Sequence, residues 1–244
     1  MYKQYLPTYT HNFLNEKKWI KKESLHYKFY FFPKSFAEKE IEKIIKTQEF
    51  GYKKIINFLK IKAKDRKIEY YLYPDKKTKK ILTGDDWYAQ AVFKEFCVHL
   101  IYNEKIKPLG PHEDMHLLSL PLGLPVGFIQ EGLAEYIVGH AWDKKSHLEY
   151  AIKGYKKNIY PNIEEFLIHK SWLKTDDKKA IFFYSLAGAF VKFLIAKNGK
   201  KKFLEFYKKS SRKNTLKTNK SIFYAVFGKE IAKTEQQFKI WLNK

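Results

Sequence analysis

The sequence predicts an α+β fold, in which a mixed sheet with helices occupies the N-terminal half and the C-terminal half is mostly helical. Aromatic and β-branched runs that suit strands lie before residue 104, whereas apolar residues at helical spacing dominate after residue 127. With 244 residues, of which 45% are hydrophobic, the chain can form one large domain or two small ones around a substantial core. A cleft between the two halves is the expected place for a functional site.

The N-terminal half is predicted to consist of an arm over residues 1–25, which shows no clear period, and an α/β subdomain over residues 26–127. Its strands are indicated by aromatic and apolar runs, and its helix by apolar residues three and four apart. The predicted elements are a strand at 26–32, a helix at 36–61, a strand at 67–73, a turn at Pro74-Asp75 and a strand at 98–102.

The C-terminal half is predicted to be a helical subdomain over residues 128–244. Its helical patterns cover residues 128–142, 163–172, 179–198, 200–209 and 221–243. The lysine-rich segment 208–220 contains Ser210-Ser211 and Asn214, which favours a surface loop.

The most informative stretch is His112-Glu113-Asp114-Met115-His116, which has the pattern H-E-x-x-H. Residues four apart on a helix share a face, with Cβ atoms about 5–6 Å apart, so both imidazoles can reach one ion. Glu113 projects about 100° around the helix axis from His112 and falls beside that ion. Zinc held in this way activates water and polarises a carbonyl, while Glu113 can accept the proton and pass it on. The pattern therefore predicts a zinc hydrolase, against the alternative of a solvated turn whose histidines align by chance.

A third ligand is expected on the next predicted helix. Glu131 lies 15 residues after His116, and Glu135 follows one helical turn later. One of these carboxylates can bind zinc while the other accepts a hydrogen bond from a ligand histidine and fixes its tautomer. Glu131 is the predicted ligand and Glu135 its outer partner, and His140 and His147 remain alternative third ligands.

At residues 112–142, with the sequence HEDMHLLSLPLGLPVGFIQEGLAEYIVGHAW, the chain resembles the gluzincin peptidases, and within them the peptidase MA-like group. The E-G-L-A-E-Y run at 131–136 is characteristic, and a weaker likeness extends over 182–207 and 221–242. The resemblance implies a zincin-like fold and one zinc ion per chain, held by His112, His116 and Glu131, with Glu113 as the general base. In zinc peptidases a strand edge near the site commonly pairs with extended substrate, and the strand at 98–102 comes just before the zinc helix.

Several residues depart from related patterns. Ser119 and Leu122 stand where the metzincin pattern needs glycine and histidine, which excludes that class. The G-x-M-E-N element of gluzincin aminopeptidases is missing, which favours an endopeptidase. Gly110-Pro111 leaves almost no helix before the first histidine. Asp114 places a carboxyl group next to Glu113, where like-charge repulsion would raise the pKa of the base.

A hydrogen-bond donor opposite the zinc would stabilise the charge that develops on the carbonyl oxygen. Tyr184, Tyr136, His140 and His147 are the candidates. We favour Tyr184, because it begins the helix that follows the site. The alternative for Tyr184 is the ordinary role of a buried aromatic ring.

The formal net charge is +22, which invites a nucleic-acid interpretation. Arginine is the residue best suited to phosphate and base contacts, yet Arg66 and Arg212 are the only arginines. We therefore expect weak attraction to polyanions or anionic surfaces and no specific nucleic-acid binding. Cys97 is the single cysteine, so an intrachain disulfide is excluded, and it is predicted to be a small buried side chain. His99 is predicted to be a strand histidine with its hydrogen bonds satisfied.

The sequence predicts no transmembrane segment, because no run of about 18 apolar residues was found. No secretory leader opens the chain, so it is cytoplasmic if complete and exported if a leader has been removed. The favoured function is a zinc-dependent peptidase that acts on a peptide or protein. The alternatives are a catalytically inactive zincin-like binding or scaffold module on an anionic surface and, less favoured, a nucleic-acid binder.

Overall fold

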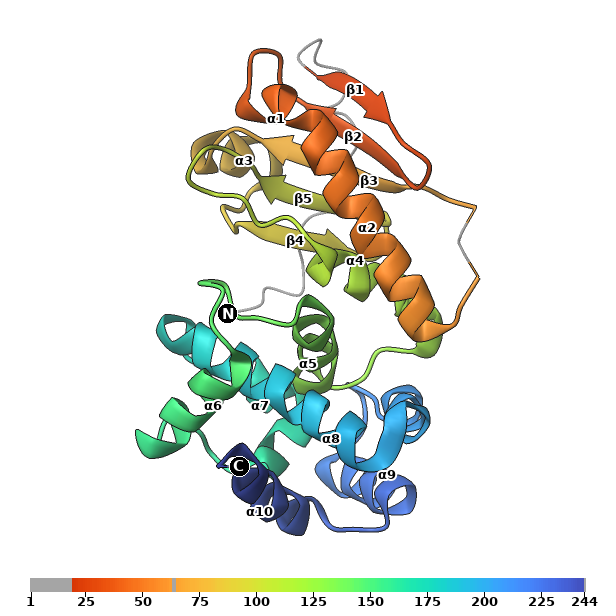
Figure 1. Cartoon of the computed structure of the whole chain (residues 1–244), viewed down its shortest axis with the longest axis vertical. Helices are drawn as coiled ribbons and strands as arrows, with labels where there is room; N and C mark the ends of the chain where they lie inside the picture. The colour runs from red at the N-terminus through yellow and green to blue at the C-terminus, as the bar shows by residue number, and fades with distance from the viewer. Residues whose placement is uncertain (1–18, 63–64, 244) are drawn as a thin grey trace. The chain divides into compact units, whose positions relative to one another are not determined.

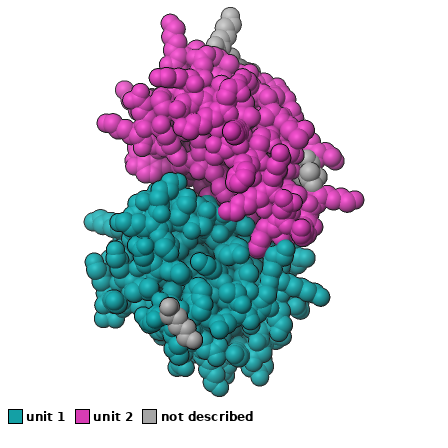
Figure 2. All heavy atoms as spheres, in the orientation of Figure 1, with its two compact units in different colours: residues 1–2, 120–244 teal, residues 3–119 magenta. Residues whose placement is uncertain are grey.

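The computed structural model describes residues 19–62 and 65–243 (Figure 1). The chain divides into two compact units, a sheet unit that ends at Ser119 and a helical unit that begins at Leu120 (Figure 2). The sequence placed the start of the helical subdomain at residue 128. The fold class is α+β with a mixed sheet, as predicted.

Within the described residues, the sheet has five strands in the order β1-β2-β3-β5-β4. These are β1 (Ile20–Glu23), β2 (Tyr27–Phe31), β3 (Ile68–Tyr73), β4 (Ala89–Val92) and β5 (Cys97–Ile101). The central strands β2, β3 and β5 run parallel, whereas β1 and β4 pair antiparallel at the two edges. The three predicted strands are confirmed as β2, β3 and β5. The expectation that residues 1–25 form an arm is wrong for residues 20–23, which form β1, and residues 1–18 lie outside the described residues.

The helices of the sheet unit are α1 (Phe36–Lys39), α2 (Ile41–Leu59), α3 (Lys76–Thr83) and α4 (Pro111–Leu118). The single helix predicted over 36–61 is therefore two helices, which separate at Glu40 (φ −106°, ψ 14°). The predicted turn at Pro74-Asp75 leads into α3, because the Asp75 side chain accepts a hydrogen bond from the Thr78 backbone N–H at 2.7 Å and caps the helix. Helix α2 packs against α4, and a Cβ on Gly51 would meet the Pro111 side chain at 3.4 Å.

The helical unit is built around α8 (Ala180–Lys209), which packs against α5 (Gly127–Val138) and α6 (His147–Lys156). Its other elements are η2 (Leu120–Leu122), η3 (Ile163–Leu167), α7 (His169–Trp172), η4 (Asp177–Lys179), α9 (Leu216–Phe227) and α10 (Ile231–Leu242). The break between the helices predicted at 179–198 and 200–209 is confirmed as a kink at Gly199, whose φ of 80° and ψ of 154° are not helical.

Three predictions for this half need correction. Helix α6 was not predicted. The predicted loop over 208–220 is shorter, because α8 continues to Lys209 and α9 begins at Leu216. The helix predicted over 221–243 is the end of α9 followed by α10, and the two are separated at Gly228, where a φ of 71° suits glycine.

Glycines allow α5 and α8 to approach closely. A Cβ on Gly132 would lie 2.6 Å from the Ala187 carbonyl oxygen, and one on Gly188 would lie 2.8 Å from the Glu135 Cβ. Both distances are shorter than van der Waals contact allows. The two helices therefore pack backbone against backbone at the level of Glu131 and Glu135, and this packing fixes the position of both carboxylates within the helical unit.

The helix over Asp177–Lys209 is long and apolar enough to cross a membrane, by length and composition alone. This differs from the sequence expectation that no such segment exists. The central helix of a water-soluble domain meets the same criterion, and α8 packs in that way against α5 and α6.

Candidate metal centre

Helix α4 carries the two predicted imidazole ligands. It begins with Pro111 at its first position, directly after Gly110, whose φ is 126°. The Nε2 atoms of His112 and His116 lie 3.3 Å apart, and the ring planes are nearly perpendicular, at 84°. Two nitrogens that each lie 2.0–2.1 Å from a tetrahedral zinc ion are separated by about 3.3–3.4 Å. The pair therefore fits a shared ion, although a hydrogen bond between the two rings would also suit this distance.

Asp114 fixes the opposite side of α4 to the sheet. Its carboxylate accepts hydrogen bonds from the Tyr27 hydroxyl at 2.6 Å, the Tyr70 hydroxyl at 2.5 Å and the Gln48 amide at 3.1 Å. Burial raises the pKa of Asp114 to about 7, although the hydrogen bonds from Tyr27 and Tyr70 oppose this shift, and the nearby charge of Glu113 adds to it. Asp114 therefore points into the unit and acts as an anchor of the helix.

Gln48 extends this anchor to the turn before α4. Its Oε1 accepts a hydrogen bond from the Gly110 N–H at 2.8 Å. Its two Nε2 hydrogens are shared among three acceptors, which are Asp114, the Gly110 carbonyl at 3.2 Å and the Tyr70 hydroxyl at 2.6 Å. Gln48 is fully buried on the face of α2 that also carries Ile41 and Ile44. A glutamine within an apolar helical stripe is the one sequence signal that could have pointed to this role.

Glu113 lies between the histidines in the first turn of α4 and is half-buried. Burial raises the pKa of the Tyr70 hydroxyl, and the negative charges of Asp114 and Glu113 add to this shift. Burial lowers the pKa of Lys79, and the charge of Glu113 is among the smaller effects that oppose this shift. The Phe93 ring, in the turn between β4 and β5, has its centroid 6.5 Å from that of His116. Strand β4 packs against α4 and is an edge of the sheet, whereas β5 lies between β3 and β4. The sheet edge beside the histidines is therefore formed by β4. The expectation that the strand at 98–102 forms the edge that pairs with substrate is wrong, because β5 has a neighbour on both sides.

Helix α5 carries the two predicted carboxylates, Glu131 and Glu135, both of which are buried. The start of this helix is held by His169, whose Nδ1 accepts a hydrogen bond from the Gly127 N–H at 3.0 Å. Burial lowers the pKa of His169 to about 4, and the positive charge of Arg212 contributes, while Glu131 opposes the shift.

Arg212 holds the same helix start from the loop after α8. Its Nε donates to the Pro125 carbonyl at 3.3 Å, its backbone N–H donates to the Leu124 carbonyl at 3.2 Å, and its guanidinium also donates to Gln130. Neither His169 nor Arg212 was predicted to have a role. They come from segments about 40 and 80 residues away along the chain, and no sequence pattern relates them to α5.

The alternative third ligands have local partners. The Nε2 of His147 lies 3.1 Å from the Glu135 carbonyl oxygen and 3.3 Å from Glu135 Oε2, and its Nδ1 lies 3.3 Å from Ser185 Oγ. The Nδ1 of His140 lies 2.9 Å from the Ala141 carbonyl oxygen. Glu135 is thus in contact with His147, and its predicted hydrogen bond to a ligand histidine stays a prediction.

Tyr184, the favoured transition-state donor, packs between two tryptophans. Its ring centroid lies 5.5 Å from that of Trp142 and 5.5 Å from that of Trp172. Tyr136, another candidate donor, lies on α5 and is half-buried. These contacts orient the Tyr184 ring, and the donor role stays a prediction.

The predicted site residues fall into two groups. His112, Glu113 and His116 lie together on α4 of the sheet unit, whereas Glu131 and Glu135 lie together on α5 of the helical unit. Two imidazole nitrogens and a carboxylate oxygen form a donor set that suits zinc. Their convergence on one ion stays a prediction.

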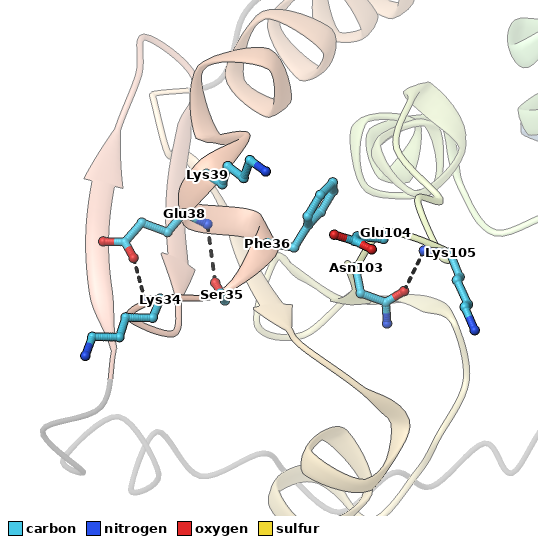
Figure 3. A pocket seen from close by; sticks show the side chains of 8 residues that line it. All are labelled: Lys34, Ser35, Phe36, Glu38, Lys39, Asn103, Glu104 and Lys105. Atoms are coloured by element: carbon cyan, nitrogen blue, oxygen red, sulfur yellow. Dashed lines mark hydrogen bonds between the residues drawn. The ribbon is translucent and has the colours of Figure 1, made fainter.

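A surface hollow of about 640 Å³ lies elsewhere in the sheet unit, between the start of α1 and the segment after β5 (Figure 3). It is lined by Lys34, Ser35, Phe36, Glu38, Lys39, Asn103, Glu104 and Lys105. Charges of both signs surround it, and none of the predicted site residues lines it. The hollow therefore adds nothing to the metal-site prediction.

Comparison of the chain with models of known protein families gave no match, and a search of curated proteins gave none.

Proposed function

We propose that this protein is a zinc-dependent peptidase of the gluzincin type, most simply an endopeptidase. The observation that carries the proposal is the pair of imidazole Nε2 atoms 3.3 Å apart on α4, with Glu113 between them in the sequence. The Asp114 and Gln48 hydrogen bonds support it further, because they hold this helix in place through protein contacts alone. A rigid ligand pair is what a catalytic metal site requires.

In this proposal Glu131 provides the third ligand. Its support is the spacing from His116, the likeness of the E-G-L-A-E-Y run to gluzincins, and the buried position of Glu131 on a helix whose start is held by His169 and Arg212. Three protein ligands leave the fourth position of a tetrahedral zinc open, as catalysis needs.

Glu113 serves as general base and then general acid in the proposed reaction. When bound, zinc would supply a water of lowered pKa and polarise the scissile carbonyl. The Glu113 carboxylate projects about 100° around α4 from His112, beside the metal position, so it would take the proton from the attacking water. It would then deliver that proton to the departing amide nitrogen.

Strand β4 is the proposed binding edge for extended substrate. It packs against α4, and its outer side is an edge of the sheet. A peptide could add there as a further strand through main-chain hydrogen bonds. Phe93 directly follows β4, and its ring centroid lies 6.5 Å from that of His116, so it would contact a substrate side chain.

The experiment that tests the proposal measures hydrolysis of a peptide library by the zinc-loaded chain and its Glu113→Gln variant. We expect the variant to lose at least about 100-fold in rate, the lower range for general acid–base catalysis, while its zinc content stays unchanged. Glu149→Gln, at an exposed position of α6, is the matched control and should retain full activity. A folded, zinc-loaded wild type without any hydrolysis would overturn the peptidase and favour the binding or scaffold module.

A further inference from the structure

A second group of metal-binding side chains lies wholly within the sheet unit and is formed by Glu95, Cys97 and His99. Cys97 and His99 lie two residues apart on β5, so both side chains point to the same face of the sheet. Glu95 lies in the turn over 93–96 that joins β4 to β5. One ligand atom from each residue lies within 4.8 Å of the others.

This group lies on the face of the sheet opposite to α4. Tyr70 points toward α4, where it reaches Asp114, and Tyr70 pairs in register with Val98. The residues on either side of Val98, which are Cys97 and His99, therefore face the other way. The group is thus separate from the His112 and His116 pair.

The distances within the group suit a tetrahedral ion. Cys97 Sγ lies 3.5 Å from His99 Nε2 and 3.9 Å from Glu95 Oε2. For zinc at 2.3 Å from sulfur and 2.0–2.1 Å from nitrogen, a tetrahedral angle separates these two atoms by about 3.5–3.6 Å. Glu95 is half-buried in a turn, so its carboxylate can close the remaining few tenths of an ångström.

The His99 ring is oriented by neighbours in the way that metal-binding histidines usually are. Its Nδ1 lies 2.8 Å from the Tyr73 hydroxyl, which leaves Nε2 directed toward Cys97. The Tyr71 ring stacks on it at a centroid distance of 4.9 Å and an angle of 17°. A hydrogen bond to the second ring nitrogen fixes the tautomer and orientation of a ligand histidine.

Charged residues around the group have both signs. Glu69 of β3 pairs in register with Cys97 of β5. The Glu69 carboxylate accepts a hydrogen bond from the Tyr71 hydroxyl at 2.8 Å and lies 3.4 Å from the Lys28 ammonium group. Arg66 donates to the Glu95 backbone carbonyl, whereas the Glu95 carboxylate accepts from Cys97 Sγ at 3.9 Å. Two carboxylates thus lie near the thiol.

We propose that Glu95, Cys97 and His99 bind a second divalent transition-metal ion of the zinc class at a buried site, whose fourth coordination position these three side chains leave open. A thiolate, an imidazole and a carboxylate suit zinc or cobalt and disfavour the hard ions calcium and magnesium. Cys97 and His99 are fully buried, which disfavours access of a substrate to the ion. Binding displaces the thiol proton into solvent, and the ion links the β4–β5 turn to the face of the sheet.

The test uses cobalt(II) as the probe and exploits the single cysteine. Because Cys97 is the only cysteine, any thiolate-to-cobalt charge-transfer absorption of the full chain reports this group alone. We expect that absorption in the wild type and also in a His112→Ala/His116→Ala double variant, with about one ion bound per group. It should vanish in Cys97→Ser, and His26→Gln is the control for loss of an unrelated histidine, because His26 pairs with Glu49 and belongs to neither metal group.

Thermal unfolding gives a second readout that does not depend on colour. Zinc should raise the midpoint of the double variant, and the rise should be lost in a triple variant that also carries Cys97→Ser. A folded wild type that binds cobalt without thiolate absorption would overturn the proposal. Because the peptidase is tested by Glu113→Gln and this site by Cys97, either proposal can fail while the other stands.

Discussion

Asp114 is the residue on which the position of the proposed metal ligands depends most directly. Its carboxylate is fully buried and accepts hydrogen bonds from Tyr27, Tyr70 and Gln48, which come from β2, β3 and α2. In the sequence it looked like an unfavourable charge beside the base. In the fold it points to the opposite side of α4, where it is the hydrogen-bond acceptor for three buried polar groups that water does not reach.

Replacement of Asp114 by alanine should therefore destabilise the sheet unit. The variant leaves the Tyr70 hydroxyl buried without the Asp114 acceptor, whereas Tyr27 can still donate to the Gln48 carbonyl at 3.0 Å. We expect a cost of about 3 kcal/mol in the free energy of unfolding, measured by urea denaturation. Asp86→Ala is the control, because that side chain is 52% exposed. Equal midpoints for the two variants would contradict the anchoring role.

His169 makes the stability of the helical unit depend on pH. Its pKa is lowered to about 4, whereas an unfolded histidine titrates near 6.5. The neutral ring accepts the Gly127 N–H, so below pH 6.5 the unfolded chain binds the proton more readily and stability falls until pH 4. Above pH 6.5 both states are neutral and the effect disappears.

The measurement compares wild type with His169→Gln, whose amide oxygen can still accept a hydrogen bond. Between pH 7 and pH 5 the wild type should lose about 2 kcal/mol more unfolding free energy than the variant. Carboxylates titrate in both proteins, so the difference isolates the histidine. Parallel pH profiles would contradict the prediction, because they would show that folding does not lower the pKa of His169.

At the scale of elements, the contact between α5 and α8 depends on Gly132. A methyl group there would lie 2.6 Å from the Ala187 carbonyl oxygen and 2.7 Å from Val191 Cγ2. Gly132→Ala should push the helices apart and cost about 1–3 kcal/mol in the free energy of unfolding.

Gly51→Ala is the matched control for this prediction. Gly51 also lies inside a helix, but its added Cβ would make only an ordinary contact of 3.4 Å with Pro111. Alanine is the better helix former by about 1 kcal/mol, so the control should be neutral or slightly stabilising. A loss of the same size in both variants would mean that close helix packing is not the cause.

Elements with a long apolar period could be predicted from the sequence, and short polar ones could not. The residues of α2 and α8 repeat at helical spacing over many turns, so local pattern and tertiary packing agree. Strand β1, with the sequence I-K-K-E, and strand β4, with A-Q-A-V, are defined mainly by their pairing partners.

Helix α6 shows a signal that could have been used. Its buried residues include His147 and Ala151, which form no apolar stripe. However, Ser146 accepts a hydrogen bond from the Leu148 N–H at 3.1 Å, and Glu149 follows three residues after the serine. Serine followed by glutamate at this spacing is a capping-box signature, so the start of α6 was predictable although its packing was not.

At the scale of the whole molecule, the sequence predicted the part of the candidate site that lies within one helix. The i, i+4 spacing of His112 and His116 fixes their relation through helix geometry alone. The residues that hold this helix, such as Tyr27, Gln48 and Tyr70, are separated by more than 40 residues from Asp114 along the chain. Only the fold brings them together, so a single sequence does not reveal them.

Removal of the metal shows whether the fold holds the metal ligands in place without the ion or whether the ion is needed for the protein to fold. Small zinc modules unfold without their ion, because the ion supplies most of their folding free energy. Here α4 is fixed to the sheet unit by the Asp114 and Gln48 hydrogen bonds, which involve no metal. Chelation should therefore abolish peptide hydrolysis while the far-ultraviolet circular dichroism of the chain stays unchanged.

The midpoint of thermal unfolding should nevertheless fall, because an ion present at 1,000 times its dissociation constant adds about 4 kcal/mol per site. Zinc should restore both the activity and the unfolding midpoint, and calcium should restore neither. Calcium binds oxygen ligands, whereas both proposed groups contain imidazole nitrogen and one of them also contains a thiolate. Two compact units need not unfold in a single transition, so the shift is best followed by a probe confined to the sheet unit, such as amide hydrogen exchange of β2, β3 and β5. An apo chain that lost its helical signal would show that the metal, and not the Asp114 hydrogen bonds, holds α4 in place.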